Sequence, residues 1–277
     1  MRRIRRAVIV LLGFTAALLT LAALALQVPE VAAVVREWPI GPGPGPTPEP
    51  PVITAPAGPL PAGPAGLTEL AQYGTQRFRG AGCGFLLRLP SGSVIGVTTA
   101  HSVAALGQPG NNLQNMAFAL PGSADHLADF SNLYGEPGVP FSGDDLSVDY
   151  VLLRLPGSVD AAPALAQYPD ARGAPQPGER VALYSGLGGQ GGPVRVLLGT
   201  VMSSAQTAAW LLMDEDFDPG GMSGSPVVSA YTGRVVGMAV GASRERGRVL
   251  IGINPIGGIV QHALAAHDFP TIASFNR

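Results

Sequence analysis

Short apolar runs separated by glycine and proline most constrain what this chain can fold into. The sequence contains 38 glycines and 27 prolines among 277 residues. From residue 67 onward, stretches rich in Val, Leu and Ile end repeatedly at such turn residues, which predicts short β-strands. The predicted strands are residues 77–89, 93–99, 116–120, 149–155, 181–185, 194–202, 208–213, 226–229, 234–240 and 248–253. Many short strands with turns between them favour an all-β barrel or sandwich.

Four segments depart from this strand pattern. Residues 67–73 are expected to form a short helix or turn, and residues 101–106 a single helical turn. Residues 125–143 are rich in loop-forming residues. Residues 256–267 carry apolar side chains at helical spacing, which predicts a helix that closes the domain.

The amino terminus has a basic flank followed by an apolar run. Residues 1–6 include four arginines, and residues 7–28 are uncharged and mostly apolar. The length of the run favours a retained membrane helix, because the core of a signal peptide usually has about 7–15 residues. Small residues at 23–25 leave a cleaved signal as the alternative. Since arginine-rich flanks stay in the cytoplasm, we expect a single-pass cell-membrane protein whose domain lies outside the cytoplasm, or a secreted one after cleavage.

The next segment, residues 29–66, is rich in proline and glycine. Such a composition cannot pack a core and favours extended polyproline geometry, so it is interpreted as a spacer. We therefore predict three parts: a basic stub with a membrane helix at residues 1–28, a linker at 29–66, and one globular domain at 67–277.

Charge and cysteine content exclude several classes of protein. The formal net charge is −2 and only 13% of the residues are charged. Without a basic excess, a nucleic-acid partner is not expected. Cys83 is the single cysteine of the sequence, which rules out an intramolecular disulfide. A packed core must therefore stabilise the domain.

Ser223 lies in the motif Gly220-Gly221-Met222-Ser223-Gly224-Ser225-Pro226, just before a predicted strand. Glycines allow a sharp turn and let the backbone come close to a bound group. A serine hydroxyl needs a neighbouring base to become a nucleophile. The N–H groups of Gly221 and Ser223 could hold the oxyanion that forms in acyl transfer. The alternative is an ordinary β-turn in a glycine-rich protein, so the upstream partners decide.

Two upstream residues are candidate partners of Ser223. His101 ends an apolar strand at a corner, and a neutral imidazole is a suitable base for serine at physiological pH. Asp149 stands at the start of an apolar strand, where a buried acid needs a hydrogen-bonding partner. A histidine N–H would satisfy it. The competing acids Asp144 and Asp145 lie in a polar loop and are interpreted as solvated.

Three motifs in this order resemble those of the chymotrypsin-like (trypsin-like) serine peptidases, in particular their disulfide-poor bacterial branch. The matching stretches are Gly82-Cys83-Gly84-Phe85 with Thr98-Thr99-Ala100-His101, Asp149-Tyr150-Val151-Leu152-Leu153, and Gly221-Met222-Ser223-Gly224-Ser225-Pro226. The resemblance covers about residues 77–264. It implies two packed antiparallel six-stranded β-barrels, at about residues 67–165 and 178–265, with a C-terminal helix.

The resemblance also implies a role for each site residue. Ser223 would attack the substrate carbonyl, His101 would transfer the proton, and Asp149 would orient His101. The N–H groups of Gly221 and Ser223 would form the oxyanion hole. No cofactor or metal ion is implied. Cys83 stands where animal members have half of a disulfide, but the partner position is Ser102, so we interpret Cys83 as a buried apolar residue.

Substrate-binding residues are likewise implied by position. The strand residues Met238, Ala239, Val240 and Gly241 would pair with an extended peptide of a protein substrate. Residues 217–220 and about 241–252 would wall the pocket for the side chain before the scissile bond. Phe217 replaces the acid that trypsin has there, which favours small or apolar side chains. The nearby acids at 216 and 218 leave this specificity open.

The sequence therefore predicts a serine endopeptidase tethered outside the cytoplasmic membrane. The main alternative is a catalytically inactive peptide-binding module on the same fold. A second alternative is a structural protein of the cell envelope.

Overall fold

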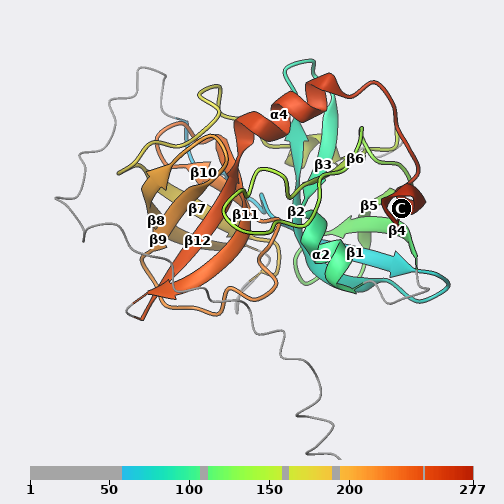
Figure 1. The fold of residues 1–277 in the computed structure, drawn as a ribbon, viewed down its shortest axis with the longest axis horizontal. Helices are drawn as coiled ribbons and strands as arrows, with labels where there is room; N and C mark the ends of the chain where they lie inside the picture. Colours follow the sequence, from blue (N-terminus) through green and yellow to red (C-terminus); the bar gives the residue numbers. More distant parts are fainter. Residues whose placement is uncertain (1–57, 107–111, 158–161, 189–193, 246, 277) are drawn as a thin grey trace, which may run out of the picture. The chain divides into compact units, whose positions relative to one another are not determined.

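Two six-stranded antiparallel sheets and a C-terminal helix make up the folded part of the chain (Figure 1). The structure is a computed structural model that describes residues 58–106, 112–157, 162–188, 194–245 and 247–276. Within these ranges, no helix is long and apolar enough to cross a membrane. The predicted membrane helix and most of the predicted linker lie outside the described residues. The all-β prediction is confirmed for the part described.

The first sheet has the strand order β5-β4-β1-β2-β3-β6. Its strands are β1 (Leu67–Tyr73), β2 (Arg79–Arg88), β3 (Val94–Thr98), β4 (Leu113–Ala119), β5 (His126–Phe130) and β6 (Val151–Arg154). β1 corrects the expectation of a short helix or turn, and β5 lies within the expected loop at 125–143. Both are held by pairing with distant strands, because β1 lies between β2 and β4, and β5 pairs with β4.

The first sheet has the six strands of the predicted first barrel but is an open half-barrel, so the prediction of two six-stranded barrels is confirmed in part. Beyond the end of β5, one isolated bridge joins Leu133 to Leu153 of β6. β6 has only four residues. The chain then reaches Pro156, which has no N–H group with which to extend a ladder.

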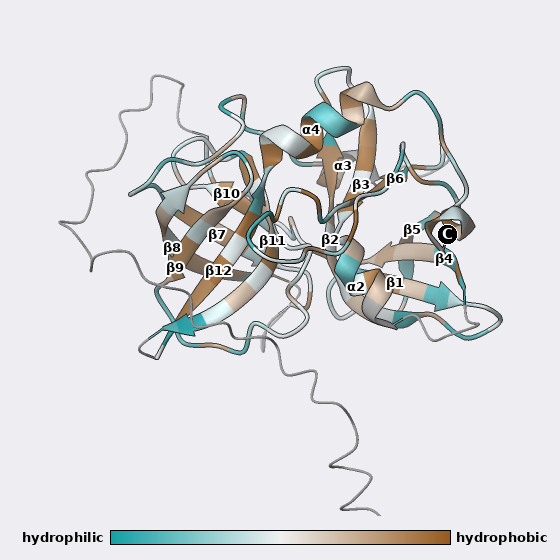
Figure 2. Cartoon of the chain, in the orientation of Figure 1, coloured by the Kyte–Doolittle hydropathy of each residue, from teal (hydrophilic) through white to brown (hydrophobic). Residues whose placement is uncertain are grey.

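The second sheet is a closed barrel, as predicted, with the order β10-β11-β12-β9-β8-β7. Its strands are β7 (Arg180–Ser185), β8 (Arg195–Ser204), β9 (Ala209–Met213), β10 (Pro226–Ser229), β11 (Val235–Glu245) and β12 (Arg248–Pro255). Pairing of β10 with β7 completes the ring. Figure 2 shows hydrophobic residues concentrated in the strands and hydrophilic ones at the outer end of the β11–β12 hairpin.

Short helices complete the fold. They are α2 (Ala100–Leu106), α3 (Ala162–Leu165), α4 (Ile256–Ala265) and the 3-10 helix η1 (Ile272–Asn276). The closing helix predicted at residues 256–267 is confirmed as α4, which follows β12 directly and buries Ile256, Ile259 and Ala263.

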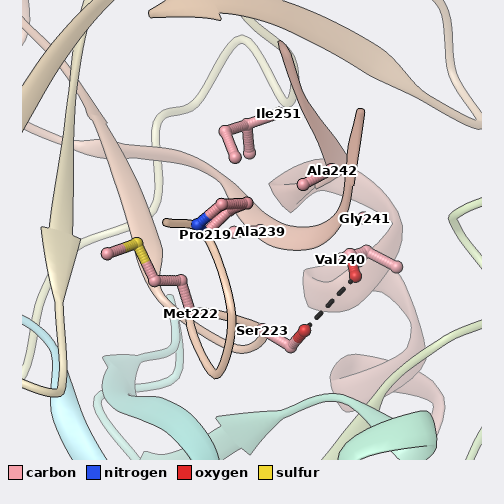
Figure 3. A pocket seen from close by; sticks show the side chains of 8 residues that line it. All are labelled: Pro219, Met222, Ser223, Ala239, Val240, Gly241, Ala242 and Ile251. Carbon is pink, nitrogen blue, oxygen red and sulfur yellow. Dashed lines mark hydrogen bonds between the residues drawn. The ribbon is translucent and has the colours of Figure 1, made fainter. Parts of the chain in front are cut away.

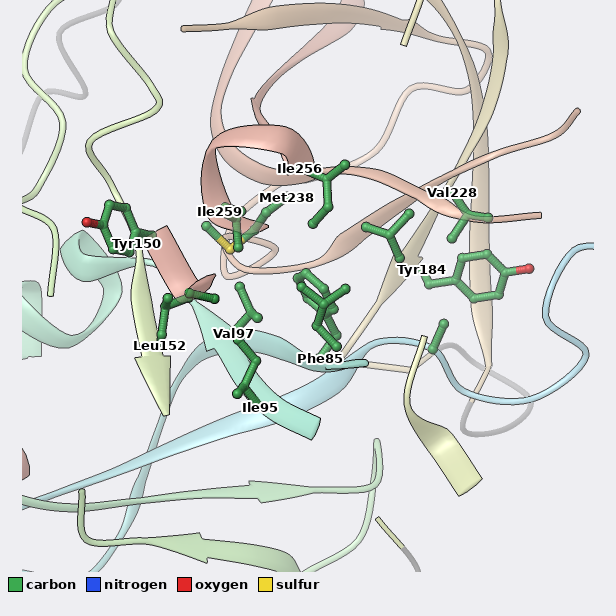
Figure 4. Packing of buried hydrophobic residues seen from close by; sticks show 14 of the residues in the cluster. Phe85, Ile95, Val97, Tyr150, Leu152, Tyr184, Val228, Met238, Ile256 and Ile259 are labelled. Carbon is green, nitrogen blue, oxygen red and sulfur yellow. The ribbon is translucent and has the colours of Figure 1, made fainter. Parts of the chain in front are cut away.

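One apolar core lies between the two sheets (Figure 4). The first sheet contributes Phe85 and Val97, the second contributes Tyr184 and Met238, and α4 contributes Ile259. All five are at most 2% exposed. Because this core contains residues of both sheets, removing apolar surface from water holds the sheets face to face.

A buried cluster of charges joins the segment between the sheets to the closed barrel. The guanidinium of Arg172 donates to Asp170 at 2.7 and 2.9 Å and to Glu179 at 2.8 and 3.1 Å. Burial alone would raise the pKa of Asp170, but hydrogen bonds from Arg172 and Thr232 outweigh it and lower that pKa. Both carboxylates are therefore satisfied by one cation.

We expect Arg172→Ala to lower the free energy of unfolding by about 3–5 kcal/mol at pH 7, because it leaves two buried carboxylates without their cation. Arg180→Ala is the matched control, since Arg180 pairs with Asp214 at the surface, where a pair contributes about 0–1 kcal/mol. Urea unfolding of both variants makes the comparison. The stability that Asp170 gains from Arg172 is fully present above the ordinary carboxyl pKa and is lost as pH falls through the lowered pKa of Asp170. The difference in unfolding free energy between wild type and Arg172→Ala should therefore shrink in acid. Equal losses in the two variants would contradict this assignment.

Candidate active site

Asp149 is the buried centre of a hydrogen-bond cluster at the start of α2. Its side chain is fully buried. Oδ1 accepts hydrogen bonds from the backbone N–H groups of Ala100 at 2.6 Å and His101 at 3.0 Å. Oδ2 accepts one from the Phe141 N–H at 3.2 Å and lies 2.7 Å from His101 Nδ1. The carboxylate thus satisfies N–H groups at the first turn of α2 and fixes the histidine at the same time.

His101 connects Asp149 to Ser223. With Nδ1–H donating to Asp149, the neutral ring presents Nε2 as an acceptor. Nε2 lies 2.8 Å from Ser223 Oγ. The structure therefore brings together the three side chains selected from the sequence, which come from three distant segments. The Phe141 ring stands edge-on to the imidazole, with 5.6 Å between ring centroids.

Ser223 lies in a tight loop that both sheets hold in place. Its carbonyl accepts a hydrogen bond from the Cys83 N–H of β2 at 2.8 Å. The next residue, Gly224, donates to the Ala239 carbonyl of β11 at 2.8 Å. Gly224 has φ +90°, and a Cβ there would lie 1.7 Å from the Cys83 carbonyl oxygen. Only glycine allows this approach of the serine loop to the first sheet.

Two N–H groups beside the Ser223 hydroxyl are candidates to bind an oxyanion. Among the described residues, neither the Gly221 nor the Ser223 N–H has a hydrogen-bond acceptor. Gly221 adopts φ +75°, a left-handed conformation, and its carbonyl oxygen lies 3.2 Å from the Cys83 sulfur. These donors are thus available to a bound group.

A small cavity of about 40 Å³ opens beside Ser223 (Figure 3). Its lining residues are Pro219, Met222, Ser223, Ala239, Val240, Gly241, Ala242 and Ile251. The wall contains no charged side chain. Asp216 forms a surface ion pair with Arg244, and Asp218 accepts a hydrogen bond from the Gly220 N–H at 2.9 Å.

The cavity includes three of the five residues expected to bind substrate, namely Ala239, Val240 and Gly241. Met238 lies instead in the core between the sheets, and Phe217 in the core of the closed barrel. Pro219, Ala242 and Ile251 fall within the expected walls. Met222 was not expected to line the cavity. The sequence identifies it only as the residue before Ser223 and does not show that its side chain forms part of the cavity wall.

Other residues singled out in the sequence lie outside this cluster. His126 lies 2.6 Å from Asp129 at the surface, and His262 of α4 stacks on Tyr150. Cys83 is fully buried, and burial raises the pKa of its thiol to about 11. A neutral thiol suits the interpretation of Cys83 as a small buried residue.

Glu69 is a residue next to the site that sequence reasoning missed. It is fully buried and forms hydrogen bonds with Thr98 and Ser102, which stand on either side of His101 in the sequence. Burial raises the pKa of Glu69 to about 8, against the opposite effect of those hydrogen bonds. The sequence did contain a signal for a buried acid. If residues 67–73 are read as a strand, Glu69 lies on the same face as the apolar residues Leu67 and Ala71.

No family model matches the chain, and no curated protein matches it. Among solved structures, kallikrein-related peptidase 10 is similar with a TM-score of 0.47 and 18% identity, over 72% of this chain and 93% of that chain. A complex of the same peptidase with Zn²⁺ is similar with a TM-score of 0.42 and 15% identity, over 70% of this chain and 91% of that one. At these values, neither likeness assigns an activity to this chain.

We expect Gly224→Ala to destabilise the protein by about 2–5 kcal/mol, because a left-handed alanine costs about 1–2 kcal/mol and the clash with Cys83 adds an overpacking cost. Gly92→Ala is the matched control. Gly92 has the same φ of +90°, but a Cβ there has no neighbour within 4 Å. Denaturant unfolding measures both, and a loss no greater at Gly224 than at Gly92 would argue against the close approach.

Proposed function

We propose that this protein is a chymotrypsin-like serine endopeptidase that hydrolyses peptide bonds through Ser223, His101 and Asp149. The observation that carries the proposal is the unbroken hydrogen-bond chain from Asp149 Oδ2 through both ring nitrogens of His101 to Ser223 Oγ, with contacts of 2.7 and 2.8 Å. Its assignment to the disulfide-poor bacterial branch stays a prediction.

Each group in the chain has a defined task in this proposal. Ser223 Oγ attacks the substrate carbonyl while His101 Nε2 takes its proton, and the resulting imidazolium is stabilised by the Asp149 carboxylate. The imidazolium then gives the proton to the leaving amine, which yields an acyl-enzyme. Water, activated by the same histidine, releases the acid product and regenerates Ser223.

Electrostatic stabilisation of the intermediate would come from the N–H groups of Gly221 and Ser223. Neither donates elsewhere among the described residues, so no internal bond there has to break before an oxyanion binds. Donors that are already in place cost no reorganisation during the reaction.

The exposed part of β11 is proposed to hold the substrate. β10 pairs with β11 only as far as Met238, and Ala239 still exchanges hydrogen bonds with Gly224 and Ser225 of the serine loop. From Val240 onward, β11 has no strand ladder on that side among the described residues. An extended peptide can add there as a further strand, next to the cavity and Ser223. A small uncharged cavity suits a small apolar side chain before the scissile bond.

Tethering outside the cytoplasmic membrane is also proposed. Its support is the arginine-rich flank at residues 1–6 and the apolar run at 7–28. A cleaved signal in the same segment would produce a secreted enzyme.

We expect a fluorophosphonate probe to label the full-length chain at Ser223, because the probe requires an activated serine. Ser223→Ala should abolish labelling and lower peptide hydrolysis by about 10⁴-fold or more. Ser91→Ala, at an exposed turn, is the control and should label as wild type.

A folded chain that is not labelled by the probe and does not hydrolyse peptides would contradict the peptidase proposal and favour the inactive peptide-binding module. Extraction of labelled membranes with alkaline carbonate examines the tether. Label that stays with the membrane supports an anchor, whereas release into the soluble fraction argues for cleavage.

We expect peptides with Ala or Val before the scissile bond to be cleaved with a kcat/KM about tenfold or more above that of Phe or Arg peptides. Ile251→Ala should enlarge the cavity and shift the preference toward Leu and Phe. Val249→Ala, a buried truncation on the same strand outside the cavity wall, is the control. A ranking that responds equally to both variants would rule out the cavity as the specificity pocket.

A further inference from the structure

Glu69 places a carboxyl group in an apolar layer beneath the candidate active site. β1 buries every second residue, and Glu69 takes one of these positions with no exposed surface. Its Oε2 lies 2.9 Å from Thr98 Oγ1 and 2.8 Å from Ser102 Oγ. Among the described residues, Oε1 is buried without a hydrogen-bond partner. An acid kept in such a place calls for a physical reason, since burial without full pairing is costly.

The two hydroxyl groups lead from Glu69 to both halves of the site. Ser102 directly follows His101 in α2, and its Oγ is also 3.0 Å from the Thr99 carbonyl. Thr98 Oγ1 is also 2.8 Å from the Cys83 carbonyl. The Cys83 N–H in turn donates to the Ser223 carbonyl at 2.8 Å. Glu69 thus lies between the histidine helix and the serine loop.

Gly82 shows how closely these groups pack. It is the cross-strand partner of Glu69 on β2. A Cβ at Gly82 would lie 3.1 Å from Glu69 Oε2 and 3.0 Å from the Ser223 carbonyl oxygen. Without a side chain at this position, the carboxyl group comes close to the serine loop.

The four contacts of the Thr98 and Ser102 hydroxyls outnumber the two protons that these hydroxyls carry, so a proton on the Glu69 carboxyl group serves one contact more. Thr98 and Ser102 each have one hydroxyl proton, and each has a backbone carbonyl within reach as an alternative acceptor. If the hydroxyls donate to those carbonyls, Oε2 must carry a proton in order to bond to either hydroxyl. This arrangement satisfies both carbonyls and leaves no buried negative charge.

We propose that Glu69 is a positioning residue. As a neutral carboxylic acid, it holds the His101 end of α2 and the Ser223 loop in the relative positions that the reaction requires. The inference rests on the proposed peptidase function. Glu69 touches neither His101 nor Ser223 side chains, so it acts only through Thr98, Ser102 and Cys83.

The electrostatic surroundings agree with a neutral acid. Burial is the largest influence on the pKa of Glu69, which it raises to about 8, and the negative charge of Asp149 adds to it. Tyr73 on its own strand and Cys83 on β2 are the other described titratable groups that interact with Glu69. His101 is next to Ser102 on α2. β4, which also pairs with β1, contributes no titratable residue.

Ionisation of Glu69 would disturb both halves of the site. A carboxylate at Oε2 would draw both hydroxyl protons away from the Cys83 and Thr99 carbonyls. It would also place a second negative charge near Asp149. Since small displacements of reacting groups cost much of the rate, reaction at Ser223 should slow as Glu69 loses its proton.

The test is the rate of fluorophosphonate labelling of the full-length chain between pH 5 and 10. In wild type the rate should fall about tenfold per pH unit above about pH 8. Glu69→Gln, a neutral isostere, should lose this alkaline fall and remain within about threefold of wild type at pH 7, whereas Glu69→Ala should be about tenfold slower at every pH. Glu136→Gln makes the same change at an exposed site and should keep the wild-type profile.

Ser102→Ala provides a second variant if Glu69 variants do not fold. It removes a hydrogen bond that lowers the pKa of Glu69, so the alkaline fall should move to higher pH. Infrared difference spectra of wild type and Glu69→Gln should show a carboxylic-acid C=O band that disappears as pH rises through about 8.

The two proposals can fail separately. Labelled wild type with no alkaline fall, an unchanged fall in Glu69→Gln, an unmoved fall in Ser102→Ala, or a missing infrared band would each overturn the role of Glu69 and leave the peptidase standing. No labelling of Ser223 at any pH would overturn the peptidase, and the positioning role with it.

Discussion

The hydrogen bonding of one buried carboxylate, Asp149, is the constraint on which the rest of the site depends. A carboxylate removed from water needs donors to replace its lost hydration. Its donors come from the start of α2, from the Phe141 backbone and from the His101 ring. Because these groups belong to separate segments, satisfying the carboxylate also determines where the imidazole lies and which of its nitrogens faces Ser223.

Close contact between the two sheets positions Ser223 next to His101. The shared apolar core holds the sheets face to face, but apolar packing has no direction and cannot place a hydroxyl within 2.8 Å of a nitrogen. Directional bonds from Cys83 and Gly224 give the serine loop its position. The missing side chain at Gly224 permits that approach, so a local property of one residue allows a contact between distant strands.

Three buried acids of the domain are accommodated in different ways. Asp149 is satisfied by N–H donors, and Asp170 by the guanidinium of Arg172. Burial raises the pKa of Glu69, and hydrogen bonds with two hydroxyls do not offset that rise. A guanidinium thus lowers the pKa of Asp170, whereas two hydroxyls leave Glu69 with a raised pKa, which makes Glu69 sensitive to alkaline pH.

The sequence by itself determined the all-β class, most of the strands and the closing helix, because alternation, turn residues and helical spacing are local properties. It also selected His101, Asp149 and Ser223, since each stands in a recognisable local context. Only the tertiary structure decided that residues 67–73 form a strand, that the first sheet stays open, and that Met222 rather than Met238 lines the cavity. These outcomes depend on which distant strands pair and which face of each strand meets a neighbour, and no local pattern records that.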